Sequence, residues 1–231
     1  FNPVSIENAI KDAVTKKQYI EKDLIPFDGL WHSFNHHSKF SGPTPELKEK
    51  NKNVIEFYEA LKTSTHIFIT LGTAWVYRYL KTNTVVANCH KIPQGAFKKE
   101  LLSVTEIERS LVSLLEMIKT VNTIASVTFT VSPVRHLKDG FIENQQSKAH
   151  LLSAIHQVVK SDNTSYFPAY EIMMDELRDY RFYKQDMLHP NELAINYIWD
   201  KFTNAFMTED TIKIMSEVGQ LQKDLGHRPI H

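Results

Sequence analysis

Short apolar runs separated by amphipathic stretches constrain the fold of this chain most. Residues 66–71 are nearly continuous in apolar side chains and rich in β-branched ones, and residues 126–131 form a second run. Such runs are typical of strands that are buried on both faces of a sheet. A third short strand is expected at Tyr166 and Phe167. Because helices are expected between the strands, the order predicts an α/β fold with a mostly parallel sheet and helices on both faces.

The spacing of apolar residues predicts the surrounding helices. One helix is expected to start from a capping box at Thr105-Glu106-Ile107-Glu108, and another is expected to end near Phe206. Four further helices are expected at residues 7–22, 45–61, 144–160 and 209–225. Two further short strands, residues 75–79 and 84–87, are predicted to form a hairpin inserted after the first buried strand. Residues 27–40 have no steady period and are expected to be a loop.

Length and charge limit the classes of partner. A chain of 231 residues can form one large α/β domain with a full core. Its 27 basic and 27 acidic side chains balance, so no overall field favours nucleic acid or an anionic membrane. No apolar run approaches the roughly 20 residues of a membrane span. The single cysteine, Cys89, cannot form an internal disulfide and is interpreted as a packed thiol.

One stretch has the composition of a catalytic acid and base. Asp186 lies three residues before His189, and a nearby acid can orient an imidazole and stabilise the imidazolium that forms when the ring takes a proton from a serine. Pro190 follows and is suited to a first helical position, so a helix is expected to hold the loop still. The spacing alone is also compatible with a loop acid and histidine that merely precede a helix. A second such pair, Asp224 and His227, lies in a polar tail.

The predicted loop at residues 27–40 carries many aromatic and histidine side chains. Trp31, His32, His36 and His37 are candidates for a lid or substrate wall, or they cover the edge of the core. A zinc site is a third interpretation, because His36 and His37 with His32, His66 or His90 offer nitrogen ligands. Adjacent histidines rarely point at one ion, and no Cys or acid stands in a usual zinc pattern, so no metal site is assigned.

Polar residues also follow the predicted strands. Gly72 ends the run at residues 66–71, where a glycine can bring backbone N–H groups up to an anion or can simply make a turn. Arg135 and His136 follow the run at residues 126–131. Arg135 is a candidate for holding an anionic substituent of a substrate. Asn88 ends the predicted hairpin.

Several of these segments together resemble the GSCFA family, a bacterial branch of the SGNH/GDSL-type hydrolases. The resemblance covers essentially the whole chain and rests on five segments: Trp31-His32-Ser33-Phe34-Asn35-His36-His37-Ser38, Thr70-Leu71-Gly72-Thr73-Ala74-Trp75, Asn88-Cys89-His90-Lys91, Ser132-Pro133-Val134-Arg135-His136 and Asp186-Met187-Leu188-His189-Pro190. It implies a flavodoxin-like three-layer α/β/α domain that cleaves or transfers an ester-linked acyl group through a Ser-His-Asp arrangement.

The resemblance also implies roles for single residues. His189 is expected to be the general base, Asp186 its orienting acid, and Gly72 a residue of the oxyanion hole. Related hydrolases usually have an Asn shortly after this glycine, but Thr73-Ala74-Trp75 follows Gly72 in this chain. Asn88 is a possible replacement for that Asn. The Gly-Ser-Cys-Phe-Ala segment that names the family and supplies its serine does not occur in these residues. The chain starts Phe1-Asn2-Pro3 without an initiator Met, so the segment and the first strand are expected upstream in a longer protein.

The leading hypothesis is therefore an ester hydrolase or acyltransferase acting on an acylated carbohydrate or another small ester. The expected organisation is a single domain over residues 1–231, truncated at its N-terminus, with an inserted hairpin near residues 75–90 and a helical tail at residues 209–231. Trp31, His32, His36, His37, Asn88, Arg135 and His136 are the candidate substrate-binding residues. The alternatives are an inactive carbohydrate-binding module and a metal-dependent hydrolase that uses the clustered histidines. No cofactor is implied, and the sequence indicates neither compartment nor oligomeric state.

Overall fold

The computed structural model describes residues 1–36, 40–45, 47–160 and 163–226. The chain divides into two compact units, Phe1–Tyr170 and Glu171–His231. Among the described residues, no helix has both the length and the apolar composition needed to cross a bilayer.

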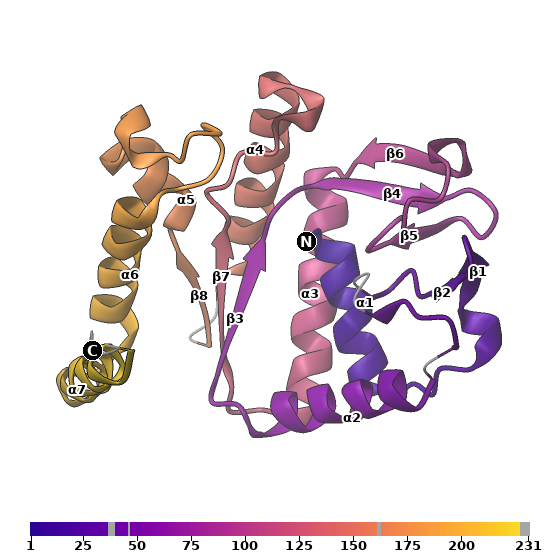
Figure 1. Cartoon of the computed structure of the whole chain (residues 1–231), viewed down its shortest axis with the longest axis horizontal. Helices are drawn as coiled ribbons and strands as arrows, with labels where there is room; N and C mark the ends of the chain where they lie inside the picture. Colours follow the sequence, from indigo (N-terminus) through magenta and orange to yellow (C-terminus); the bar gives the residue numbers. More distant parts are fainter. Residues whose placement is uncertain (37–39, 46, 161–162, 227–231) are drawn as a thin grey trace, which may run out of the picture. The chain divides into compact units, whose positions relative to one another are not determined.

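A three-stranded parallel sheet lies at the centre of the first unit (Figure 1). Its strands are β3 (His66–Leu71), β7 (Ser126–Val131) and β8 (Thr164–Phe167), in the order β3-β7-β8. β3 and β7 pair in register from His66 opposite Ser126 to Leu71 opposite Val131, so both strands end at one edge. The three predicted strands and the parallel sheet are confirmed.

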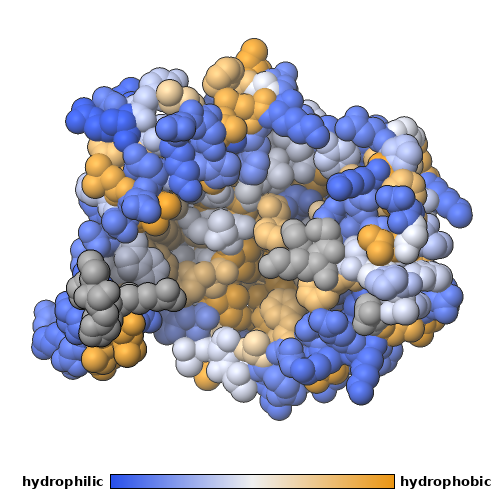
Figure 2. All heavy atoms as spheres, in the orientation of Figure 1, coloured by the Kyte–Doolittle hydropathy of each residue, from blue (hydrophilic) through white to orange (hydrophobic). Residues whose placement is uncertain are grey.

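Burial differs between the strands. In the central strand β7, Val127, Thr128 and Phe129 are all buried. In β3, an edge strand of the described sheet, burial alternates, and Phe68 is 42% exposed. The prediction that β3 is buried on both faces is therefore wrong, because the side chains of one face, His66, Phe68 and Thr70, are exposed. Figure 2 shows apolar surface over the part of the molecule where Figure 1 draws β3.

Four helices flank this sheet and give the mixed α/β architecture that the sequence predicted. They are α1 (Pro3–Val14), α2 (Leu47–Thr63), α3 (Val104–Val121) and α4 (Phe141–Val158). α3 packs against both α1 and α4, and α4 packs against β7. The core between them is closely packed: Leu111, Leu114, Phe129, Leu151 and Ile155 have no exposed surface. This arrangement agrees with a three-layer α/β/α fold.

Two helix starts differ from the prediction. α1 begins at Pro3 and not at residue 7, because the Asn2 side chain accepts a hydrogen bond from Ser5 N and caps the helix. It ends at Val14, before Lys16, which has a left-handed φ of 49°. α3 begins two residues earlier than Thr105 suggested, because Ser103 and Glu106 form the reciprocal capping box.

Antiparallel strands complete the first unit. The predicted hairpin is confirmed as β4 (Trp75–Tyr79) and β5 (Thr84–Val86), and the unpredicted β6 (Phe97–Leu101) pairs with the other side of β4. Residues 27–40 are not all loop, because β1 (Ile25–Phe27) and β2 (Leu30–His32) form a small hairpin. Asp28 and Gly29 both have positive φ, 50° and 72°, as a tight two-residue turn requires.

The second unit is helical. After α5 (Ala169–Glu171) at the boundary come the π-helical turn η5 (Ile172–Glu176), the short turn η6 (Tyr180–Phe182), α6 (Glu192–Phe206) and α7 (Glu209–Gly226). The two long helices, α6 and α7, confirm the helices predicted to end near Phe206 and to cover residues 209–225. The predicted helix start at Pro190 is wrong, because Asn191 caps α6 by accepting a hydrogen bond from Ala194 N at 3.1 Å.

Candidate active site

Asp186 and His189 form a hydrogen-bonded pair in the loop before α6. His189 Nδ1 lies 2.6 Å from Asp186 Oδ2. The other carboxylate oxygen of Asp186 accepts hydrogen bonds from the backbone N–H groups of Leu188, at 2.8 Å, and His189, at 3.0 Å. Both carboxylate oxygens are thus engaged within four residues of chain, and the imidazole is held by its Nδ1 atom.

Backbone hydrogen bonds hold this loop in place. Lys184 N donates to His189 O at 2.8 Å and Met187 N donates to Lys184 O at 2.9 Å. Met187 takes a left-handed φ of 59°, which turns the chain so that His189 faces Asp186. Asn191 Nδ2 donates to Arg181 O at 2.6 Å and connects the loop to η6.

The Asp186 carboxylate remains ionised at neutral pH. The backbone N–H of His189, then that of Leu188, then the His189 side chain lower the pKa of Asp186 to about 2. A permanent carboxylate at Nδ1 fixes the tautomer that carries its proton there and stabilises an imidazolium.

The other ring nitrogen of His189 is available. No described group binds Nε2, and the His189 and Asp186 side chains are 52% and 42% exposed. An exposed imidazole with an oriented Nδ1 can accept a proton at Nε2 from an alcohol or a water molecule.

Gly72 lies at the edge where β3 and β7 end. Its N–H donates to the Phe1 carbonyl at 2.9 Å, so in this structure the predicted oxyanion donor has a partner in the chain. A Cβ at Gly72 would lie 3.1 Å from Phe1 N and 3.4 Å from His136 Nε2. The close approach of these groups therefore favours glycine here.

Lys148 of α4 is a functional candidate that the sequence did not reveal. It is 1% exposed, and its Nζ donates to Gly72 O and to Ser132 O, both at 2.7 Å. Burial lowers the pKa of Lys148 to about 8. The available signal was its spacing: Asn144, Lys148, Leu151 and Ile155 follow one helical face, so a lysine there takes a core position.

Other α4 side chains bind the same strand ends. Ser147 Oγ accepts a hydrogen bond from Ala74 N at 2.7 Å and lies 3.2 Å from Thr73 Oγ1. Asn144 Oδ1 accepts from His136 N at 2.9 Å. Of the predicted residues here, Arg135 is half-buried and His136 is exposed. The structure thus brings His136 close to Gly72.

The candidate residues of the β1–β2 region form a separate cluster. Trp31 is half-buried and pairs with Gly42 through the backbone. His32 is 6% exposed; its Nδ1 lies 2.7 Å from Ser41 Oγ and its Nε2 lies 3.1 Å from Phe27 O. The Asn88 side chain accepts from His90 N at 2.9 Å, and the His90 ring lies 4.7 Å from that of His32. The buried histidines of this cluster are therefore bonded within the chain.

His36 belongs to this cluster and is held by Ser33. Its Nδ1 lies 2.8 Å from Ser33 Oγ, and its ring meets the Tyr19 ring edge-on. Burial, with a smaller effect of the Lys50 charge, lowers the pKa of His36 to about 4. His37 lies outside the described residues. Among the residues that are described, no three His, Cys, Asp or Glu side chains are placed to hold a metal ion.

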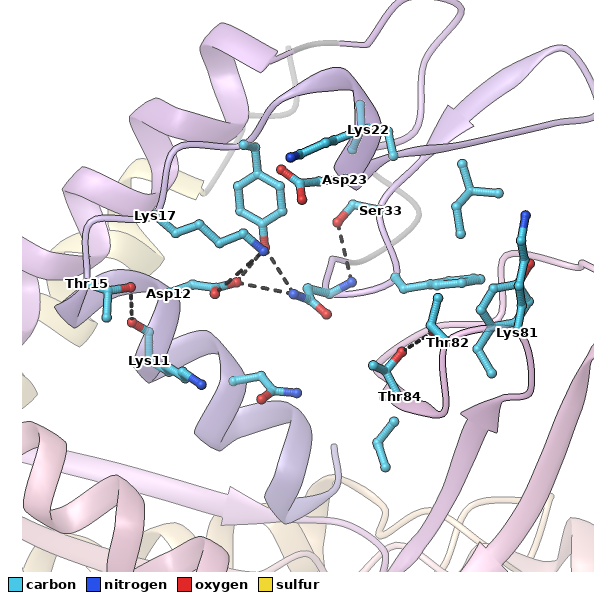
Figure 3. Close-up of a pocket in the computed structure, with 18 of the residues that line it drawn as sticks. Lys11, Asp12, Thr15, Lys17, Lys22, Asp23, Ser33, Lys81, Thr82 and Thr84 are labelled. Atoms are coloured by element: carbon cyan, nitrogen blue, oxygen red, sulfur yellow. Dashed lines mark hydrogen bonds and ion pairs between the residues drawn. The ribbon is translucent and has the colours of Figure 1, made fainter.

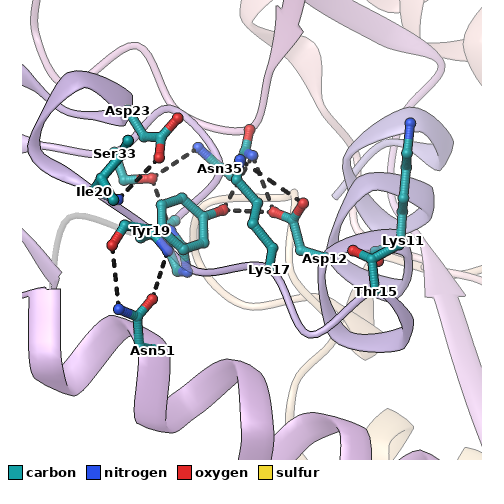
Figure 4. A network of polar contacts seen from close by, with 11 residues as sticks. Lys11, Asp12, Thr15, Lys17, Tyr19, Ile20, Asp23, Ser33, Asn35 and Asn51 are labelled. Atoms are coloured by element: carbon teal, nitrogen blue, oxygen red, sulfur yellow. Dashed lines mark hydrogen bonds and ion pairs between the residues drawn. The ribbon is translucent and has the colours of Figure 1, made fainter.

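A cavity of about 750 Å³ opens beside this cluster. Figure 3 shows side chains of α1, including Lys11 and Asp12, on one side and Lys81 and Thr84 of the β4–β5 hairpin on the other. Figure 4 shows the polar network along its wall: Tyr19 Oη donates to Asp12 Oδ2 at 2.5 Å. Asn35 Nδ2 donates to the same oxygen and to Tyr19 Oη, both at 3.2 Å.

The model of the GSCFA family matches residues 1–202, a range that includes the Asp186–His189 pair and the strand ends around Gly72. No curated protein and no solved structure matches the chain.

Proposed function

We propose, from the premise that this chain belongs to the GSCFA family, that it is an ester hydrolase or acyltransferase of the SGNH/GDSL type. The observation that carries the proposal is the Asp186–His189 pair, with Nδ1 bound to an ionised carboxylate and Nε2 free of any described partner. This is the arrangement that a serine hydrolase needs in its base.

In the proposed reaction, His189 Nε2 takes the proton of a serine hydroxyl as its oxygen bonds to the ester carbonyl carbon. The resulting imidazolium, stabilised by Asp186, returns the proton to the leaving alcohol when the ester C–O bond breaks. Water or a sugar hydroxyl then gives its proton to His189 as its oxygen attacks the acyl carbon, the bond from that carbon to the serine oxygen breaks, and the serine oxygen takes the proton back from the imidazolium. Hydrolysis and acyl transfer differ only in this acceptor.

The nucleophile is assigned to the serine of the family's Gly-Ser-Cys-Phe-Ala segment, which does not occur in these 231 residues. Two serines of the chain are poor candidates. Ser33 is 2% exposed and bound to His36. Ser132 Oγ accepts from Val134 N, and its backbone precedes Pro133, which disfavours the turn that exposes a nucleophile.

The proposed substrate is an acylated carbohydrate or a similar small ester. Arg135 and His136 follow β7, and the first is half-buried while the second is exposed. We propose that they contact polar substituents of the substrate and that Trp31 contacts a sugar or acyl face.

The test measures hydrolysis of p-nitrophenyl acetate by a chain that includes the family's serine segment. His189→Ala should lower kcat by about 10⁵-fold, because the base is lost. Asp224→Asn is the matched control for Asp186→Asn, because Asp224 also lies three residues before a histidine, and within the described residues its side chain binds Gln220. Wild-type turnover by His189→Ala would remove His189 from the mechanism.

The lysine-lined cavity supports a second candidate, a carbohydrate-binding module without ester turnover. Among the described residues, Lys11, Lys22 and Lys81 around the cavity form no ion pair and are free to meet a polar ligand. Calorimetric titration with an acetylated xylo-oligosaccharide separates the candidates. Binding that weakens in Lys81→Ala but not in Lys223→Ala, without ester hydrolysis, would favour the module, because Lys223 is not among the residues that line the cavity.

A further inference from the structure

In the described residues, the peptide bond between Gly72 and Thr73 is hydrogen-bonded through its carbonyl and not through its N–H. Lys148 Nζ donates to the Gly72 carbonyl at 2.7 Å, and the same Nζ donates to Ser132 O at the end of β7. Lys148 thus ties the ends of two adjacent parallel strands to α4. The contact fixes the orientation of the Gly72–Thr73 peptide plane.

The geometry of that plane determines where Thr73 N–H points. The peptide is trans, so its N–H is antiparallel to its carbonyl and points away from Lys148. Thr73 is partly exposed, and no described group accepts its N–H. The neighbouring donors differ, because Gly72 N is bound to Phe1 O and Ala74 N to Ser147 Oγ. Thr73 N–H is therefore the open donor at this strand end.

We propose that the Thr73 backbone N–H, in place of Gly72 N–H, donates to the oxyanion of the tetrahedral intermediate, with Lys148 as its positioning residue. The inference rests on the proposed ester chemistry and names a donor for it. Oxyanion holes are built from such preorganised N–H groups at strand ends.

The charge of Lys148 adds to this role. No described carboxylate pairs with its ammonium group, so its positive charge is not neutralised at the strand ends. A charged hydrogen bond to the Gly72 carbonyl polarises the peptide and makes the N–H at its other end a stronger donor. Lys148 therefore acts on the reacting oxygen through the peptide, without touching the substrate.

The first test replaces Thr73 by its α-hydroxy acid in a chain that carries the family's serine segment, which changes the N–H into an ester oxygen. The kcat for p-nitrophenyl acetate should fall by about 10²–10³-fold with KM changed by less than about twofold, because one oxyanion donor is lost. The same replacement at Thr105, an exposed residue in the first turn of α3, is the control. If the protein with the Thr73 replacement kept the wild-type kcat, the assignment would be overturned.

A double-mutant cycle tests the positioning role. Lys148→Met should lower kcat in the wild-type background but add little in the Thr73 ester background, because both changes remove one interaction. If Lys148 had a merely structural role, Lys148→Met would lower kcat by the same factor in both backgrounds. Lys148→Gln, which removes the charge and keeps a polar side chain, replaces Lys148→Met and should show the same non-additivity if that variant does not fold.

A second measurement does not depend on turnover. In ¹H–¹⁵N spectra, phenylphosphonate, a stable tetrahedral anion, should shift the Thr73 amide downfield in the wild type and not in Lys148→Met, and leave the Thr105 amide unmoved. If the chain has no esterase activity but this shift occurs, the proposed function fails, and Thr73 N–H remains assigned as a donor to a bound tetrahedral anion. An unmoved Thr73 amide overturns the assignment in either case.

Discussion

Two histidines of this protein contact a polar side chain three residues before them, with opposite results. His189 Nδ1 lies 2.6 Å from the Asp186 carboxylate, and the ring is 52% exposed. His36 Nδ1 lies 2.8 Å from the Ser33 hydroxyl, and burial lowers the pKa of this ring to about 4. The sequence spacing and the contact distance are nearly the same.

The two pairs differ in the charge of the partner side chain and in the exposure of the ring to solvent. Asp186 stays ionised and stabilises a protonated ring, whereas the Ser33 hydroxyl is neutral and its buried surroundings oppose protonation. A residue pair at this spacing is therefore suited to proton transfer only when the acid is charged and the ring is accessible. The other pair serves to hold a loop.

The largest expected effect separates the two pairs by activity. In a chain with the family's serine segment, Asp186→Asn should reduce kcat for p-nitrophenyl acetate by about 10³–10⁴-fold, because the ring loses its orienting charge. His36→Gln should stay within about threefold of wild type. An equal loss in both variants would mean that the half-buried His36 also takes part in the chemistry.

The second prediction concerns acid stability. The folded His36 pKa, about 4, lies below the ordinary value of 6.5, so the unfolded chain binds the proton more readily between these pH values. The free energy of unfolding should fall by about 2 kcal/mol as the pH drops from 6.5 to 4, a value reduced because the ring is only partly buried. Urea unfolding at pH 7, 5 and 4 should show a shallower decline in His36→Gln. If the free energy of unfolding declined equally in the wild type and in His36→Gln, burial of His36 would not be the cause of the decline.

The third prediction removes the partner of the buried ring. Ser33→Ala leaves His36 Nδ1 and Asn35 N without their described hydroxyl partner and should lower the free energy of unfolding by about 1–2 kcal/mol. Ser153→Ala, on the exposed side of α4, is the matched control and should be neutral. Thermal unfolding of both variants measures the difference. A neutral Ser33→Ala would show that the contact contributes nothing to stability.

The smallest expected effect concerns the support of the exposed pair. Asn191→Ala removes the cap of α6 and should lower the free energy of unfolding by about 1 kcal/mol. Asn204→Ala, exposed within the same helix, is the control. The ester hydrolysis rate should fall far less than in Asp186→Asn, because Asp186 still binds His189. A larger loss of rate would place Asn191 in the positioning of the ring.

Local patterns predicted much of the fold. The bounds of β3 and β7 follow from their apolar runs, and the β4–β5 hairpin and the helices follow from their periodicity. Helix starts were less well predicted, because capping depends on side-chain rotamers: Ser103, not Thr105, caps α3. Strand β6 was missed because Phe97–Leu101 contains Lys98, Lys99 and Glu100 and has little apolar alternation.

The sequence by itself determined the Asp186–His189 pair, because both residues lie in one turn and their contact needs no distant part of the chain. It also determined the alternation of strands and helices. Only the tertiary structure decided that Lys148 is buried and which peptide it holds. Its acceptors, Gly72 and Ser132, lie 76 and 16 residues away in the sequence, and no local spacing predicts which strand ends a helix side chain will meet.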